Sequence, residues 1–134
     1  MPSDPPPVLR KMTPILQVDQ IEPSLPFWRS LGFAVTAEVP HEDRLGFVIL
    51  QRDGMELMMQ TLDSMRADDA SLAPERASPT YLFVEVEDLE AVRGSLVDAT
   101  LLLGPRDTFY GMREIFVREP GGNVVGLAQP IADR

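Results

Sequence analysis

The sequence predicts an α+β fold built from two tandem β-α-β-β-β modules, and a pair of similar hairpins is the first reason. Residues 47–60 and residues 110–129 each hold two apolar runs around a turn. The first turn is Asp53-Gly54, a pair that favours a tight connection between strands. The second is Pro120-Gly121-Gly122-Asn123, in which proline presets φ and the following residues tolerate a positive φ. Both segments are therefore predicted to be β-hairpins.

The spacing within the two halves is the second reason. When the hairpins are aligned from their ends, Leu57 matches Gly126. From Thr13 to Leu57 is 44 residues, and from Tyr81 to Gly126 is 45. Two unrelated hairpins would not keep this distance from an upstream strand. The chain is therefore predicted to be an internal duplication.

Module one is predicted to contain strands at residues 12–18, 33–39, 45–51 and 55–61, with a helix at residues 22–31. Leu25, Trp28 and Leu31 recur at helical spacing, and Gly32 supplies the stop. Pro26 is expected to distort the first turn of this helix, since its ring clashes with the preceding turn.

Module two repeats this order after a polar linker at residues 62–79, which has room for one short helix. A strand is predicted at residues 80–86 and a short one at 100–103, followed by the second hairpin. Asp88 is expected to cap a helix that runs to about Val97.

The chain is expected to form one domain preceded by a proline-rich arm. Residues 1–10 have too little apolar surface to offset the entropy of ordering, so they are predicted to be flexible. The domain then spans residues 11–134. Within it, module one covers residues 12–61 and module two covers residues 80–130.

Composition narrows the function. The chain of 134 residues has 21 acidic and 12 basic residues, a formal charge of −9. This charge argues against nucleic-acid binding, which needs a basic surface, and would attract cationic ligands. There is no cysteine for a disulfide, thiolate metal site or nucleophile. No apolar run is long enough for a membrane span or resembles a secretion signal, so we expect a cytoplasmic protein.

Three segments resemble motifs of the vicinal oxygen chelate superfamily, which includes glyoxalase I, extradiol dioxygenases and bleomycin resistance proteins. They are the sequences Phe27-Trp28-Arg29-Ser30-Leu31-Gly32-Phe33, Tyr110-Gly111-Met112-Arg113-Glu114 and Glu119-Pro120-Gly121-Gly122-Asn123. The superfamily usually has Asp-Pro-Asp-Gly-Asn at the last. The resemblance covers roughly residues 12–129. It implies that the sheets curl around a shared cavity, and that the protein is a homodimer in which a second subunit completes that cavity.

The resemblance also implies where a metal would bind. Metal-dependent members carry one ligand on the first strand and one on the last strand of each module. The matching positions are Thr13, Leu57, Tyr81 and Gly126. Leucine and glycine side chains offer no donor atom, and the two hydroxyls are poor ligands for a divalent metal. We therefore expect no metal and no other cofactor.

Two other residues that could bind a metal, His41 and Glu56, are also expected to point away from this site. His41, the only histidine, is predicted to lie in a turn away from the cavity. Glu56 lies one residue from the ligand position, so strand alternation predicts that it faces the other way.

The expected cavity surface is apolar, with a few polar groups. Strand alternation places Met55 and Met59 beside Leu57, and Phe83 and Glu85 beside Tyr81. Tyr110 and Met112 are expected near the rim. The predicted ligand-binding residues are Thr13, Gln17, Met55, Leu57, Met59, Tyr81, Phe83, Glu85, Tyr110, Met112 and Gly126.

Three functions are compatible with these patterns. The favoured one is a metal-free, bleomycin-resistance-like protein, of the kind linked to antibiotic resistance, that sequesters a hydrophobic, planar or cationic small molecule. The second is a lyase or dioxygenase-type enzyme with an atypical metal site, or one that uses Glu85 or Tyr81 for acid–base chemistry. The third is an interaction protein whose cavity is filled by its own side chains.

Overall fold

The computed structural model describes residues 4–132. Module one contains β1 (Ile15–Val18), the 3-10 turn η1 (Glu22–Ser24), α1 (Leu25–Ser30), β2 (Ala34–His41), β3 (Arg44–Arg52) and β4 (Met55–Thr61). Next come α2 (Leu62–Asp68) and η2 (Ala70–Leu72). Module two contains β5 (Tyr81–Glu85), α3 (Leu89–Ser95), β6 (Thr100–Asp107), β7 (Met112–Arg118) and β8 (Val124–Pro130). The first three residues of the predicted arm lie outside the described part of the chain, as do residues 133–134.

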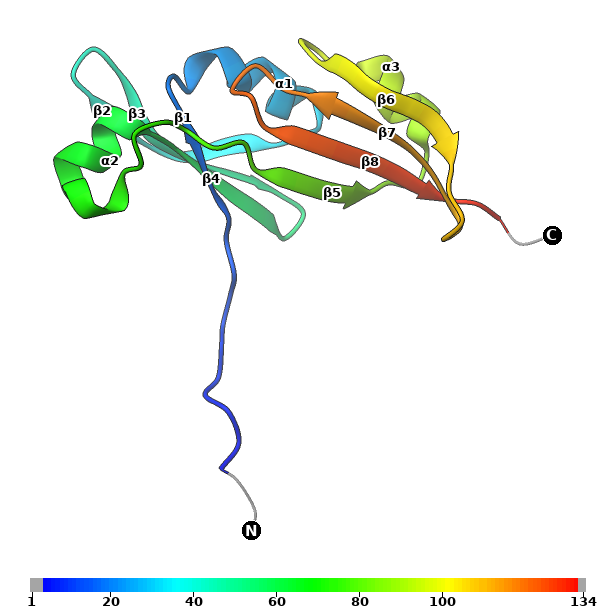
Figure 1. Cartoon of the computed structure of the whole chain (residues 1–134), viewed down its shortest axis with the longest axis horizontal. Coiled ribbons are helices and arrows are strands. Elements are labelled where there is room, and N and C mark those ends of the chain that lie inside the picture. The colour runs from blue at the N-terminus through cyan, green and yellow to red at the C-terminus, as the bar shows by residue number, and fades with distance from the viewer. Residues whose placement is uncertain (1–3, 133–134) are drawn as a thin grey trace.

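The eight strands form two mixed four-stranded sheets, and the α+β fold class is confirmed. Sheet A has the order β1-β4-β3-β2 and sheet B has the order β5-β8-β7-β6. In each sheet the first strand pairs parallel to the last, and the remaining pairs are antiparallel. Figure 1 shows the sheets side by side along the long axis, with α1 and α3 on one side of them.

One core joins the helices to the covered side of both sheets. Leu16 and Met59 from sheet A, and Val125 and Leu127 from sheet B, are fully buried in it with Trp28 of α1. Alternate strand residues point away from the helices, and we call that side of both sheets the open face. Its members on sheet A include Ile15, Gln17, Phe47, Ile49, Gln51, Glu56, Met58 and Gln60. On sheet B they include Tyr81, Phe83, Glu85, Met112, Glu114, Phe116, Val124, Gly126 and Ala128.

The turns follow the sequence chemistry. Asp53 and Gly54 have φ values of 47° and 81°, the left-handed pair that a two-residue hairpin turn requires. In the second hairpin Gly122 has a φ of 94°, and the Glu119 amide donates to the Asn123 carbonyl oxygen. The loop of the second hairpin is longer than that of the first, so the two turns have different geometries.

Strand β6 differs from the expectation, whereas the distorted start of the first helix and a short helix in the linker were both expected. The first helix starts as the 3-10 turn η1, because Pro23 and Pro26 occupy its opening turns. Strand β6 extends to Asp107, well beyond the short strand predicted at residues 100–103. The linker begins with α2, in which the Thr61 hydroxyl caps the helix by accepting from the Ser64 amide at 3.1 Å.

Candidate functional site

The open face is the candidate site, because large apolar side chains remain exposed on it in a single chain. Tyr81 is 70% exposed and Phe83 is 53% exposed, although both lie on a strand within a sheet. Ile15 on sheet A is also about half exposed. Soluble monomers rarely leave such side chains uncovered on one surface unless that surface binds something.

The floor of the open face on sheet B is aromatic. Gly126 in the central strand β8 pairs with Phe83 on one side and Phe116 on the other. The two rings tilt toward each other with centroids 6.4 Å apart. A β-carbon on Gly126 would lie 2.7 Å from Phe116 Cε2, so only glycine leaves room for this ring. The arrangement offers ring faces on which a planar group could stack.

Next to this floor lies a buried carboxylate held by two partners. Glu114 is completely buried. Its Oε1 accepts hydrogen bonds from Arg106 Nε at 3.0 Å and Nη2 at 2.9 Å. The Tyr110 hydroxyl donates to the same carboxylate at 2.8 Å. Glu114 therefore fixes the positions of Arg106 and Tyr110, both of which remain half exposed.

The same contacts shift two proton equilibria. The hydrogen bond to Glu114 raises the pKa of Arg106 above its usual value, with the charge of Glu114 adding to the effect. The hydrogen bond to Glu114 also raises the pKa of Tyr110, and desolvation adds to it. Both groups therefore keep their protons at neutral pH, and neither is a candidate base.

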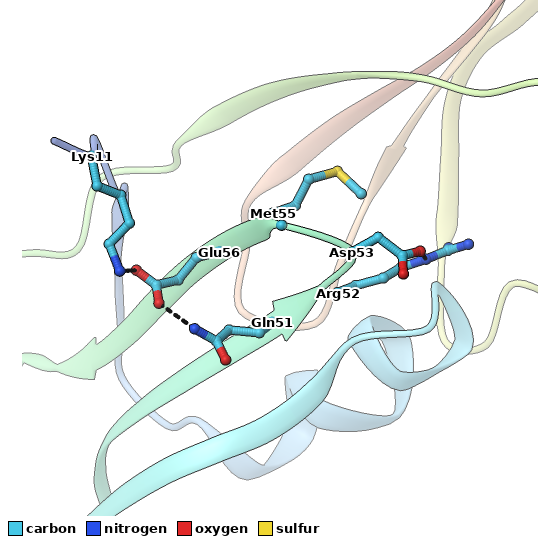
Figure 2. A pocket seen from close by; sticks show the side chains of 7 residues that line it. Lys11, Gln51, Arg52, Asp53, Met55 and Glu56 are labelled. Carbon is cyan, nitrogen blue, oxygen red and sulfur yellow. Dashed lines mark hydrogen bonds and ion pairs between the residues drawn. The ribbon is translucent and has the colours of Figure 1, made fainter.

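Sheet A carries a different polar centre, built on Glu56. Its Oε2 accepts from the Thr13 hydroxyl at 2.6 Å and pairs with Lys11 Nζ at 2.9 Å. Its Oε1 accepts from Gln51 Nε2 at 2.6 Å. Figure 2 shows Lys11 and Gln51 pointing at Glu56 from opposite sides. These bonds, that from Thr13 first, lower the pKa of Glu56 to about 2.

A pocket of about 310 Å³ adjoins Glu56 at the tip of the β3–β4 hairpin. Lys11, Gln51, Arg52 and Asp53 line it together with Met55 (Figure 2). Its charged side chains are already paired with one another, Lys11 with Glu56 and Arg52 with Asp53. The aromatic floor on sheet B, rather than this pocket, is therefore the better surface for an organic ligand.

The alternation predicted for β4 was wrong by one residue. Leu57 and Met59 are buried in the core instead of lining the open face, and Met55 shares their side of the strand at the exposed hairpin tip. Glu56 lies on the open face, contrary to expectation. The two hairpins had been aligned with Gln60 on Gln129, whereas the strand register places Gln60 on Ala128. The polar residues at positions 56 and 60, against apolar residues at 57 and 59, were the signal that could have corrected the alignment.

The remaining predicted residues form two groups. Thr13 and Gln17 lie on the open face of sheet A, and Tyr81, Phe83, Glu85 and Gly126 lie on that of sheet B. Tyr110 and Met112 lie at the β6–β7 end of sheet B. The prediction missed Arg106, Glu114 and Phe116. Alternation along β7 places Glu114 and Phe116 on one face, but nothing in the sequence pairs Glu114 with Arg106.

The residues present do not fit a divalent metal. Met58 pairs with Ile15 in sheet A, and Gly126 pairs with Phe83 in sheet B. Because Ile15 and Phe83 occupy matching positions in the two modules, Met58 is the counterpart of Gly126. The four implied positions thus hold threonine, methionine, tyrosine and glycine, and the Phe116 ring occupies the space beside Gly126. Among residues 4–132, no group of three or more histidine, cysteine, aspartate or glutamate side chains is placed to hold a metal ion.

The paired β-α-β-β-β modules, each with its first and last strands parallel, define a fold of the vicinal oxygen chelate type. Comparison with known families agrees. The sequence model of the Glyoxalase/Bleomycin resistance protein/Dioxygenase superfamily matches residues 11–127. The chain belongs to this superfamily. A comparison with curated proteins gives no match.

Solved structures share the fold at low sequence identity. A glyoxalase/bleomycin resistance protein/dioxygenase from Nocardioides superposes with a TM-score of 0.69 at 20% identity, covering 96% of this chain and 89% of the other. TioX from Micromonospora sp. ML1 gives 0.69 at 16% identity, covering 91% and 99%. A protein of unknown function from Agrobacterium tumefaciens strain C58 gives 0.71 at 19% identity, covering 93% and 97%. At these identities the likeness establishes the fold alone.

Within the described part of the chain, no helix combines the length and the apolar character needed to cross a membrane.

Proposed function

We propose that the protein is a metal-free, ligand-binding member of its superfamily that sequesters a planar, cationic small molecule on the open face. The observation that carries the proposal is the exposed aromatic floor of Tyr81 and Phe83 with Glu85 beside it. Apolar and aromatic surface with a few placed polar groups is the usual makeup of a small-molecule site.

Glu85 supplies the negative charge that would attract a cationic ligand. It is exposed, lies two residues beyond Phe83 on the same face, and has no ion-pair partner among the residues that the structure describes. Its neighbour across β8 is Glu114, whose charge is already balanced by Arg106. A cation stacked on the Phe83 ring would therefore meet one unbalanced carboxylate.

The proposal includes a homodimer and a cytoplasmic location. A second copy facing the open face would cover the side chains that a single chain leaves exposed, and would turn a surface into a cavity. The exposure of Tyr81 and Phe83 also speaks against the vestigial alternative, in which the protein's own side chains would fill the site. Sequestration of a toxic drug is the role that this arrangement supports best.

Binding is tested by isothermal titration with a planar aromatic cation and its uncharged isostere. We expect Phe83→Ala to weaken both about fivefold, because the stacking surface is lost. Glu85→Gln should weaken only the cation, by a similar factor. Leu72→Ala, which removes an equally exposed side chain far from the site, is the matched control and should change neither.

Two results would contradict the proposal. One is the absence of binding by a panel of planar cations to the wild-type protein. The other is stoichiometric Zn, Ni, Mn or Fe in the purified protein by elemental analysis, which would restore the metalloenzyme alternative.

A further inference from the structure

A bulge in strand β6 sets the face on which Arg106 lies. Leu103 pairs with Phe116 and Arg106 pairs with Glu114, so β6 advances three residues while β7 advances two. Residues three apart in a regular strand would point to opposite faces, because side chains alternate. The bulge therefore turns Arg106 to the open face. Gly104 makes the bulge possible, since its φ is 93° and a β-carbon there would collide with the Glu114 carbonyl oxygen.

Glu114 then fixes which part of the Arg106 guanidinium a ligand can reach. Its Oε1 accepts from Nε at 3.0 Å and from Nη2 at 2.9 Å, which leaves the Nη1 end of Arg106 outside this contact. The Glu114 side chain is completely buried, whereas that of Arg106 is 49% exposed. A buried carboxylate therefore holds one edge of the guanidinium, and the opposite edge can bind a second group.

Arg106 and Glu85 lie at opposite ends of one row of residues across sheet B. The register runs from Glu85 on β5 through Ala128 and Glu114 to Arg106 on β6. Three strand spacings of about 4.8 Å place the α-carbons of the two end residues roughly 14 Å apart. The next row along the strands is the aromatic floor that includes Phe83. A flat molecule on this floor would have a carboxylate near one end and a guanidinium near the other.

The two ends of this row favour different groups. Glu85 is an exposed carboxylate, which attracts a cation. Arg106 keeps its charge, because the hydrogen bond to Glu114 raises its pKa. A free guanidinium edge matches a planar carboxylate through two parallel N–H···O bonds. Since Glu114 already balances the charge of Arg106, short hydrogen bonds rather than a net charge would hold the carboxylate of the ligand.

We propose that the open face selects an amphoteric ligand, a planar molecule with a cationic group beside Glu85 and a carboxylate on the Nη1 end of Arg106. The proposal rests on the proposed function and deepens it by naming the second charged group of the ligand. Arg106 is then a specificity-determining residue, and Glu114 is the residue that positions it. Changing Arg106 lowers affinity only for ligands that carry the carboxylate.

The first test uses isothermal titration with three compounds that share one flat ring system. One carries an ammonium group, the second carries the ammonium and a carboxylate at the far end, and the third carries only the carboxylate. We expect the second compound to bind about fivefold more tightly than the first, because it adds charge-assisted hydrogen bonds to Arg106. The third should bind most weakly, since its only charge is that of Glu85.

The second test changes the guanidinium. Arg106→Lys keeps a cation beside Glu114 but removes the planar second edge, so the amphoteric compound should lose its fivefold advantage. Binding of the ammonium compound should not change. Arg113→Lys is the matched control, because Arg113 is 48% exposed, forms two hydrogen bonds to Asp107, and lies on the other face of β7. It should affect neither compound.

A double variant guards against misfolding. Arg106→Gln combined with Glu114→Gln removes both members of the pair, so no unpaired charge is left buried. The advantage of the amphoteric compound should again disappear. Unchanged binding of the ammonium compound to each variant reports that the site is folded.

The outcomes separate the amphoteric ligand from the proposed function. An amphoteric compound that binds no better than the ammonium compound, or that keeps its advantage in both Arg106 variants, would overturn the role of Arg106 and leave the cation site in place. If none of the three compounds binds the wild-type protein, both proposals are wrong.

Discussion

Module one and module two share a backbone plan but place different chemistry on the open face. The strand register matches Ile15 with Phe83, and Met58 with Gly126. By the same register, Gln60 in module one corresponds to Ala128 in module two. Module one thus carries aliphatic and amide side chains at the positions where module two carries an aromatic ring beside two small residues. On the covered side both modules keep buried apolar residues in the middle of the last strand, Leu57 and Met59 in one and Val125 and Leu127 in the other.

This difference indicates which side of each sheet is constrained by packing within the chain. Each sheet must bury the same side against the helices, so a polar residue there would lose its hydrogen bonds to water. The open face packs against nothing within the chain. Its side chains were free to diverge, and the divergence left module two with the features of a ligand site.

The variant with the largest expected effect adds a side chain to the aromatic floor on sheet B. Gly126→Val should lower the free energy of unfolding by about 3 kcal/mol, because its β-carbon would lie 2.7 Å from the Phe116 ring. Phe116→Leu in the same chain should recover part of the loss. Urea denaturation measures both.

The matched control is a glycine with free space. No atom lies within 4 Å of a β-carbon on Gly94 in α3, and its φ is not positive. Gly94→Ala should therefore stabilise the protein by up to about 1 kcal/mol. Equal effects at the two glycines would show that the floor is not tightly packed.

A second test removes the charge of Glu114, the completely buried carboxylate on the open face of module two. Glu114→Gln should cost about 2 kcal/mol, since a buried carboxylate that accepts charged hydrogen bonds is replaced by an amide that cannot satisfy all its donors. Asp107→Asn changes the neighbouring pair with Arg113, in which both side chains are half exposed, and should have little effect. Equal losses of stability in the two variants would contradict the difference expected between the buried and the half-exposed pair.

The smallest effect lies in module one and depends on pH. The pKa of Glu56 is lowered to about 2 in the folded protein, chiefly by the hydrogen bond from Thr13. Its stabilising effect is therefore fully present above the ordinary glutamate pKa near 4.5 and is lost as pH falls toward 2.

The measurement compares unfolding of the wild type and Glu56→Gln from pH 6 down to pH 2. The gap between them should be constant at the upper end and close as pH falls through the interval from about 4.5 to 2. Thr13→Val, which removes the largest cause of the shift, should make the wild-type advantage disappear at a higher pH. A gap that does not change with pH would mean that Glu56 is not held as described.

The sequence predicted both turns and most of the elements, though not the full length of β6, because these features depend on local chemistry. Asp53, Gly54 and Gly122 adopt a positive φ, and aspartate and glycine are residue types that tolerate this conformation in turns. It predicted the face of Phe83 and Gly126 correctly for the same reason, since alternation within one strand is local.

The rest depended on contacts between distant residues. The face of Leu57 required the register between β1 and β4, and the alignment of Gln60 with Gln129 was one residue away from it. The burial of Glu114 required knowing that β6 continues to Asp107, so that Arg106 lies opposite it. The link from Glu56 to Lys11 joins a strand to the segment before β1 across 45 residues of sequence, and no local pattern encodes it.

The ring over Gly126 also orders the steps by which this lineage could gain a metal centre. A carboxylate at position 126 would be the natural ligand on β8, but its β-carbon would lie 2.7 Å from Phe116 Cε2, so the ring would have to move. Mutation at 116 must therefore come first, and on its own it would only loosen the floor. The reverse order passes through an unstable protein. While Phe116 is present, mutations can adjust the existing aromatic surface more easily than they can convert it into a metal site.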